Sequence, residues 1–465
     1  MNPAPFPGRL AWYLPVAVFL LVTITQLWLV ARAGTDIPFQ DQWDSEGHWL
    51  YPAWHEGSLH AADLFRPHNE HRIVWTHLLN LGLFVANGQW DPLVQQFCGA
   101  LLHGAVVALL AALLARGFGS GAQWGLAAGI GVACLPIAGW HNALWGFQSQ
   151  VYFALLFALL AFGWLAGAVP FSRSSWAGVA AVGAMFLAMG AGLLAPMAWL
   201  GVLLLRGGAR RDFGLAWCRE ALLPVSLVLV ASFLLVPVPE HAALHAGSAG
   251  QFIIALGRML AWPHTGQPLA AVILNLPLVL AVGARLTGRR QAAPGEDLIV
   301  MIALWVVGIA AAAAWSRGGS AEFAAGVPSR YADLLVLLPL ANTWWAVVLA
   351  RESVRWRAGA RLVTTAWIVF LFVGWAGLSA EVMHRLILPR MRDRDAPVRL
   401  MQEFQRRGDA AVFTGQPRLL VPHPNLGSVT AVLDDPRLKG ALPPSLQPER
   451  PLGPLSRAVR WLLGR

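Results

Sequence analysis

The chain has 465 residues, of which 57% are hydrophobic and only 12% are charged. A water-soluble domain carries roughly twice that charged fraction, so the composition excludes an ordinary soluble protein. The formal net charge of +10 would suit a nucleic-acid-binding protein. However, the arginines fall mainly in short loops between apolar runs, as they do in membrane proteins. We therefore expect membrane lipids as partners, and no nucleic acid.

Apolar runs long enough to cross a hydrocarbon core of about 30 Å recur along the whole chain. The first run follows Arg9 and precedes no small-residue cleavage site, so we interpret it as a retained signal anchor. The pattern predicts an all-α polytopic membrane protein with about eleven transmembrane helices. Between residues 177 and 205, glycines indicate either a tight turn or a kink. The expected spans are 10–30, 92–115, 123–139, 146–168, 177–190, 192–205, 214–236, 267–285, 298–315, 329–350 and 362–380.

Arginine placement orients these helices. One alternating set of loops holds most of the arginines, and the positive-inside rule assigns that set to the cytoplasm. The N-terminus is then cytoplasmic, and an odd number of spans places residues 31–91 and 381–465 on the periplasmic side of a bacterial inner membrane. The cytoplasmic set is Arg9, Arg116, Arg173, Arg206, Arg210, Arg211, Arg285, Arg289, Arg290, Arg351, Arg355, Arg357 and Arg361.

This orientation divides the chain into two parts. Residues 1–380 form the transmembrane body, which includes the first periplasmic loop, 31–91. Within that loop, residues 73–86 are apolar with a helical period but too short to span, which indicates a juxtamembrane helix. Residues 381–465 are polar and rich in proline and arginine, which is typical of a small outer domain or a partly irregular arm packed on the helices.

Acidic residues are sparse within the expected spans, and the three cysteines lie in or beside apolar segments. Asp333 and Glu220 near helix ends are the exceptions, and we interpret His103 as a packed histidine hydrogen-bonded to a neighbouring helix. An ion-coupled transporter needs charges or broken helices near the membrane midplane. The odd cysteine count, with no paired spacing, predicts neither a disulfide framework nor a zinc site. The concentration of acids and histidines at one face instead favours an enzyme that opens at the outer membrane surface.

The first motif follows the first span and contains Asp41 and Asp44, the candidate catalytic acids, and Glu46, a candidate substrate contact. Several carboxylates at a membrane surface can supply a positioned general base. Asp41 and Asp44 are three residues apart and would share a face of a helical turn. A solvated acidic loop, with aspartate as a helix cap, is the alternative.

The second motif runs from Arg66 to Arg72 and includes His68, Asn69, Glu70 and His71. The two histidines and Glu70 have the chemistry of ligands for a divalent metal ion, but a lone His-x-x-His is weak evidence for metal. His71 and Arg72 equally suit a phosphate group. The third interpretation, which we favour, is a polar cluster that contacts the substrate.

The third motif, residues 140–148, lies at an expected outer helix junction. Trp145 and Phe147 suit stacking on a sugar, while Asn142 and Gln148 offer hydrogen bonds. An interfacial aromatic belt explains the tryptophans but not the paired amides.

The fourth motif lies in the outer loop between the ninth and tenth expected spans, where Arg317 stands at one end and Arg330 and Tyr331 at the other. Guanidinium groups bind phosphate through a fixed fork of donors, so a lipid phosphate is the expected partner. The alternative is an arginine that snorkels to lipid headgroups. Arg258 and His264, in the preceding outer loop, form a similar but weaker pair.

Together these segments resemble the GT-C superfamily of membrane glycosyltransferases. The resemblance rests on acids directly after the first helix, a multispan body and arginines in a later outer loop. More closely, the motifs Asp41-Gln-Trp-Asp44-x-Glu46, His68-Asn-Glu-His-Arg72, Trp145-Gly-Phe-Gln148 and Ser329-Arg-Tyr331 are similar to a bacterial branch of glycosyltransferase-like multispan proteins.

The resemblance implies an inverting transferase that moves a sugar from a polyprenyl-phosphate donor to a cell-envelope glycan or lipid acceptor. Its base would be an acid of the first outer loop, here Asp41 or Asp44. Related transferases typically carry adjacent acids there, whereas Gln42 and Trp43 separate the acids in this chain. The sequence identifies no cofactor, and a divalent metal ion stays an open alternative. A lipid-linked-sugar flippase and an O-antigen ligase or polymerase are the competing classes.

Overall fold

The expected apolar runs form helices in the computed structural model, which describes residues 10–115, 118, 120–293, 295–353 and 355–465. Arg9 and Arg116 lie outside the described residues. Within the described residues, eight helical segments are long and apolar enough to cross a membrane. Their principal helices are α1 (Leu10–Ala33), α4 (Pro92–Leu114), α7 (Ser149–Leu165), α9 (Ala195–Arg210), α10 (Leu215–Leu234), α13 (Glu296–Arg317), α16 (Leu337–Glu352) and α17 (Arg357–Val382). The chain is thus a multi-pass helical membrane protein.

Three of the eleven expected spans form shorter helices: α5 (Ser120–Ala133), α8 (Arg173–Phe186) and α12 (Ala270–Leu286). The doubtful stretch at 177–205 breaks into α8, a 3₁₀ turn at Gly190–Leu194, and α9. A Cβ atom at Gly192 would lie 2.2 Å from the carbonyl oxygen of Met185, so this tight turn needs a glycine. A further apolar helix, α11 (Ala249–Leu260), precedes α12.

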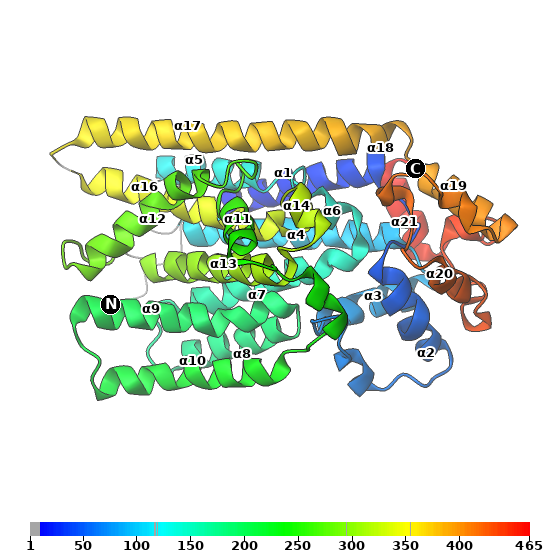
Figure 1. Ribbon diagram of the computed structural model, residues 1–465, viewed down its shortest axis with the longest axis horizontal. Helices are drawn as coiled ribbons and strands as arrows, with labels where there is room; N and C mark the ends of the chain where they lie inside the picture. The colour runs from blue at the N-terminus through cyan, green and yellow to red at the C-terminus, as the bar shows by residue number, and fades with distance from the viewer. Residues whose placement is uncertain (1–9, 116–117, 119, 294, 354) are drawn as a thin grey trace.

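The two ends of the bundle differ in character (Figure 1). At one end, loops join α9 to α10, α12 to α13 and α16 to α17, and buried or partly buried arginines pair with acids. Arg206 bonds Asp297 at 2.7 Å and Glu220 at 3.1 Å, so Glu220 is one half of an ion pair. Arg285 and Arg290 pair with Glu296 in the same region.

At the opposite end, the chain between α1 and α4 packs against the C-terminal segment (Figure 1). We call residues 34–91 and 388–465 together the cap. Its first part contains a π-helical turn (Trp43–Leu50), α2 (Tyr51–His55) and α3 (Val74–Asn87), the last of which corresponds to the expected juxtamembrane helix. Its second part contains α18 (Leu388–Arg392), α19 (Ala396–Arg407), α20 (Leu426–Leu433) and α21 (Pro454–Leu463).

The two parts of the cap share one hydrophobic core. Trp43, Tyr51 and Trp90 from the first part are at most 1% exposed, and they belong to the same cluster as Phe404 and Val429 from the second. The π-helical turn approaches α20 so closely that a Cβ atom at Gly47 would meet the Val432 side chain at 2.9 Å. The first loop and the C-terminal segment therefore fold against each other.

Candidate functional site

Asp41 stands at the start of the cap, and its backbone is held by the C-terminal segment. The preceding residue, Gln40, has a φ of 49°, a left-handed conformation that is unfavourable for a residue with a side chain. Its N–H donates to the carbonyl oxygen of Pro422 over 2.7 Å. The Asp41 side chain is 33% exposed, and its Oδ1 lies 3.6 Å from Nε2 of His68.

A tight turn brings His68 to this position. The backbone N–H groups of His68 and His71 each donate to the carbonyl oxygen of the other, at 2.7 and 3.0 Å. Asn69, between them, has a φ of 50°, which asparagine tolerates better than most residues. The His68 ring packs edge-on against Phe147 at 4.9 Å, and its buried Nε2 has no hydrogen-bond partner among the described residues.

His71 points elsewhere than His68. Its Nδ1 accepts a hydrogen bond from the N–H of Gly190 at 3.2 Å, and burial lowers its pKa below the ordinary value. No group of three His, Cys, Asp or Glu side chains with metal-site geometry occurs within the described ranges. The arrangement therefore brings His68 to Asp41 and places His71 against the turn that precedes α9.

The Asp44 side chain is hydrogen-bonded to the C-terminal segment. Its Oδ2 lies 3.0 Å from Nε2 of His423, and its Oδ1 accepts from the hydroxyl of Ser428 at 3.2 Å. Desolvation opposes ionisation of Asp44, but the His423 and Ser428 hydrogen bonds outweigh it and lower the pKa. The bond to Asp44 in turn raises the pKa of His423. The pair is therefore charged in weakly acidic solution, and Asp44 is engaged before any substrate arrives.

Glu46 lies in the centre of the cap and is 1% exposed. Its carboxylate accepts hydrogen bonds from Tyr51 at 3.0 Å, Asn80 at 2.8 Å, Trp90 at 2.8 Å and Gln95 at 2.7 Å. Burial raises the pKa of Glu46 to about 7, against the opposing effect of these donors. The contacts assign Glu46 to the cap core, although the sequence pointed to a substrate contact.

The predicted phosphate-binding arginines are paired with acids. Arg317 Nη2 lies 2.6 Å from Oε1 of Glu70, and His241 Nδ1 lies 2.5 Å from the same oxygen. Arg330 makes a two-pronged pair with Glu322, at 2.6 and 2.8 Å. Each guanidinium is thus already neutralised, which weakens its attraction for a phosphate.

The remaining sequence-predicted residues take structural positions. Arg72 donates to the carbonyl oxygen of Leu234 at 2.5 Å, where α10 ends. Arg258 donates to the carbonyl oxygens of Phe323 and Ala324. His264 stacks on Phe370, with its Nε2 2.9 Å from the carbonyl oxygen of that residue. Tyr331 lies under the Arg330 guanidinium at 5.2 Å, and Gln148 is buried in a 3₁₀ turn before α7.

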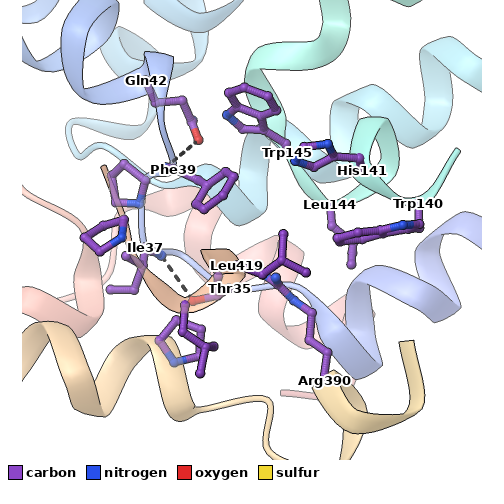
Figure 2. Close-up of a pocket in the computed structure, with 14 residues that line it drawn as sticks. Thr35, Ile37, Phe39, Gln42, Trp140, His141, Leu144, Trp145, Arg390 and Leu419 are labelled. Carbon is purple, nitrogen blue, oxygen red and sulfur yellow. Dashed lines mark hydrogen bonds between the residues drawn. The ribbon is translucent and has the colours of Figure 1, made fainter. Parts of the chain in front are cut away.

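A pocket opens beside these groups, between the first loop, the helix junction at 140–145 and the C-terminal segment. It encloses about 490 Å³ of empty space, part of it open to solvent. Figure 2 shows Phe39, His141, Trp145 and Arg390 around this space. The rings of Trp140, His141 and Trp145 form a stack with centroids 5.2 Å apart, and Phe39 meets Trp145 edge-on at 5.6 Å.

Three residues that line this pocket have a buried ring nitrogen without a partner in the part of the chain that the structure describes. Nε1 of Trp140, Nε2 of His141 and Nε1 of Trp145 are buried without a hydrogen-bond partner among the described residues. Burial lowers the pKa of His141 to about 4, so its ring is neutral at pH 7. Arg390, on the same wall, donates from Nε to the carbonyl oxygen of Ala33 at 2.8 Å. Leaving a buried donor unpaired costs about 1–3 kcal/mol, so the pocket favours a ligand with acceptor oxygens.

Sequence reasoning missed the contribution of the C-terminal segment to this site. His423 and Arg390 come from residues that carried no motif by spacing, and Glu322 was not set against Arg330. One signal was present, since His423 stands between two prolines in a segment otherwise rich in arginine. A histidine in a rigid, polar turn is a candidate for a specific contact.

Comparison with family models, curated proteins and solved structures found no match to this chain. The fold and the site together define a multi-pass helical membrane protein with a packed cap at one end of the bundle. At the boundary between cap and bundle lie a half-buried carboxylate and a pocket lined by aromatic rings.

Proposed function

We propose that this protein is an inverting glycosyltransferase of a bacterial inner membrane. It moves a sugar from a polyprenyl-phosphate donor to a glycan or lipid acceptor of the cell envelope, at the periplasmic face. In this proposal α5, α8 and α12 complete eleven crossings, the N-terminus is cytoplasmic and the cap is periplasmic. The observation that carries the proposal is the pairing of Asp41 with His68, next in sequence to Gln42, which lines the aromatic pocket.

Asp41 is the better candidate for the base. The Asp44 carboxylate already has two side-chain partners from the C-terminal segment, while the nearest basic group to Asp41 is the His68 nitrogen at 3.6 Å. A general base must reach the proton it removes without first breaking its own ion pair. We therefore assign Asp44 to holding the cap segments together.

The reaction follows from this assignment. The Asp41 carboxylate takes the proton of the acceptor hydroxyl as its oxygen bonds to the anomeric carbon of the sugar. The bond from that carbon to the phosphate oxygen breaks through an oxocarbenium-like transition state, and its electron pair leaves with the lipid phosphate.

The pocket suits the donor. Stacked aromatic rings present flat apolar faces to a sugar ring, and ring N–H groups supply donors for its hydroxyl or phosphate oxygens. Arg317 and Arg330 would have to release Glu70 and Glu322 before they could bind a phosphate. We therefore assign the leaving phosphate to Arg390 and the neutral His141 ring. Preorganised donors of this kind contribute about 2.7–4 kcal/mol each in measured enzymes.

The test is sugar transfer by the purified protein in proteoliposomes. The probes are undecaprenyl-phosphate-linked glucose, mannose, galactose and arabinose with extracted envelope lipids and glycans, and the readout is released undecaprenyl phosphate. Asp41→Asn should lower turnover by about 10²–10⁴-fold, the range that general-base catalysis supplies. Asp434→Asn, an exposed acid at the end of α20, is the control. Near-normal turnover by Asp41→Asn contradicts the assignment, and no release by the wild-type protein with any donor contradicts the function.

One observation favours a second candidate, a lipid-linked-sugar flippase. A small cavity of about 270 Å³ inside the bundle is lined by His103 and Asp333. His103 Nδ1 lies 2.7 Å from Oε1 of Gln26, which fits the packed histidine expected from the sequence. Transport predicts that a fluorescent polyprenyl lipid changes leaflet in proteoliposomes, and that Asp333→Asn slows it. Transfer without leaflet exchange supports the enzyme instead.

A further inference from the structure

The C-terminal helix α21 has two unlike faces. Ser456, Val459 and Arg460 lie on one face, where Ser456 bonds Asn87 and Asp91 and Arg460 pairs with Asp36. Positions 458, 461 and 462 are related by three and four residues and so share the other face. There, Trp461 is 80% exposed and Leu462 is 57% exposed. An exposed tryptophan beside an exposed leucine is costly in water but favourable at a membrane surface.

The depth of this face is set by contacts with the end of α1. Arg465, two residues after α21, donates to the carbonyl oxygens of Ala31 and Gly34 at 3.0 and 2.8 Å. These carbonyls belong to the last turn of a membrane-spanning helix and the residue after it. Figure 1 shows α21 beside the ends of α1 and α4, whereas α19 extends farther from the bundle. Trp461 and Leu462 are therefore at the level where the span ends.

Arginines outnumber acids near the same level, where Arg394 is offset by an exposed partner, Asp395. Arg457 is exposed on the border of the apolar face, and Arg392 is exposed at the end of α18. Arg394 and Arg465 both donate to the carbonyl oxygen of Ala31. The acids Asp36 and Asp91 are buried in ion pairs with Arg460, so they offer little charge to the surface. A positive rim around an apolar helix face complements anionic lipid headgroups.

We propose that α21 docks on the surface of the bilayer and binds anionic phospholipid there. Trp461 and Leu462 insert at the boundary between headgroups and acyl chains, and Arg457 contacts the lipid phosphates. Arg460 binds the opposite face of α21 to the first loop and to the start of α4. The lipid surface therefore supports the cap through α21. The inference is independent of the reaction proposed above.

The test uses the full-length protein in nanodiscs, with a fluorophore on Leu462→Cys in a Cys98→Ala, Cys134→Ala, Cys218→Ser background. A label on Gln405→Cys, exposed in α19 far from the bundle, is the matched control. Brominated phosphatidylcholine and brominated phosphatidylglycerol are the quenchers. Both should quench the label at 462 and neither the label at 405. The anionic lipid should be preferred, and Arg457→Gln should reduce that preference by about fivefold, the effect of one arginine near a charged surface. Arg406→Gln, an exposed arginine in α19, should not.

Each contrary outcome overturns a stated part of the inference. Equal, weak quenching at 462 and 405 shows that α21 stands in water. Shielding of the 462 label together with a disulfide-linked dimer through Leu462→Cys shows that a second copy covers this face. Equal quenching by the two lipids, unchanged in Arg457→Gln, shows a hydrophobic contact without anionic selectivity.

Discussion

Nε2 of His423 lies 3.0 Å from Oδ2 of Asp44, although 379 positions of sequence separate the two residues. Ser428 bonds the other oxygen of the same carboxylate, and Pro422 accepts from the N–H of Gln40. One short segment near the C-terminus therefore holds the backbone before Asp41 and the side chain of Asp44. The geometry of the candidate site depends on the whole chain being folded.

The Asp44–His423 pair predicts a pH dependence of this docking. The pKa of His423 is raised above its ordinary value of 6.5. The contribution of His423 to the stability of this docking is therefore complete below pH 6.5 and is lost as the pH rises through the raised pKa. The pKa of Asp44 is lowered from 3.8, so its contribution is present above that pH and is lost on further acidification. Because the Asp44 side chain is 43% exposed, we expect the pair to stabilise the docking by less than about 1 kcal/mol.

The measurement is hydrogen exchange of residues 421–430, expressed as protection factors at pH 5.5 and 8.5. The wild-type protein should lose protection at pH 8.5. The His423→Gln variant should show that lower protection at both pH 5.5 and pH 8.5. An equal pH response in the variant would mean that another group is responsible.

Glu46→Gln should remove a pH dependence of stability. Burial raises the pKa of Glu46 to about 7, above its ordinary value of 4.5. A carboxyl with a raised pKa destabilises the fold as the pH rises from about 4.5 to 7, here by about 3 kcal/mol at most. The buried Oδ1 of Asn80 has no partner among the described residues, so rotation of that amide offers an acceptor to the new NH₂ group.

We expect the thermal midpoint of the wild-type protein in detergent to fall between pH 5 and 8, and that of Glu46→Gln to stay level. Glu46→Leu leaves the buried donors of Asn80 and Trp90 unpaired and should be destabilised at every pH. Glu449→Gln, an exposed site, is the control and should follow the wild type. A wild-type profile without slope would contradict this account.

Arg460→Met should detach α21 from the cap. Arg460 lies 3.0 Å from Asp36 and also pairs with Asp91, and both acids are at most 4% exposed. Removing the cation leaves two buried carboxylates uncompensated, which costs about 3–5 kcal/mol. The expected result is loss of hydrogen-exchange protection in residues 454–463 and a lower thermal midpoint. Arg406→Met changes an exposed arginine of α19 and should leave both unchanged.

Gly146→Ala should disturb the contact between α4 and the turn before α7. A Cβ atom at Gly146 would lie 2.5 Å from both Cβ and Oε1 of Gln95, whose amide bonds Glu46. Overpacking of this kind costs about 1–3 kcal/mol. Gly183→Ala, in α8, meets nothing within 4 Å and should instead stabilise slightly. Thermal midpoints of the two variants test the difference, and a stable Gly146→Ala protein would contradict the close packing.

The sequence alone indicated the helical, multi-pass character and the positions of the apolar helices. In lipid the backbone has no water to bond, so a long apolar run must satisfy its own peptide groups as a helix. Hydropathy does not show where such a helix breaks. For that reason it did not predict that α8 and α12 are shorter than 18 residues. The motifs also predicted that polar groups of the first loop would matter, because carboxylates and histidines are rare in so apolar a chain.

Only the tertiary structure decided which of these groups is engaged. Asp41 and Asp44 are equivalent by spacing, yet Asp44 has His423 and Ser428 as partners, while the nearest basic group to Asp41 is the nitrogen of His68 at 3.6 Å. Arg317, a predicted phosphate ligand, pairs with Glu70 in the folded protein. Such pairings depend on how the cap core packs residues from opposite ends of the chain. Local periodicity carries no information about contacts over that separation, because they form only when the whole hydrophobic core assembles.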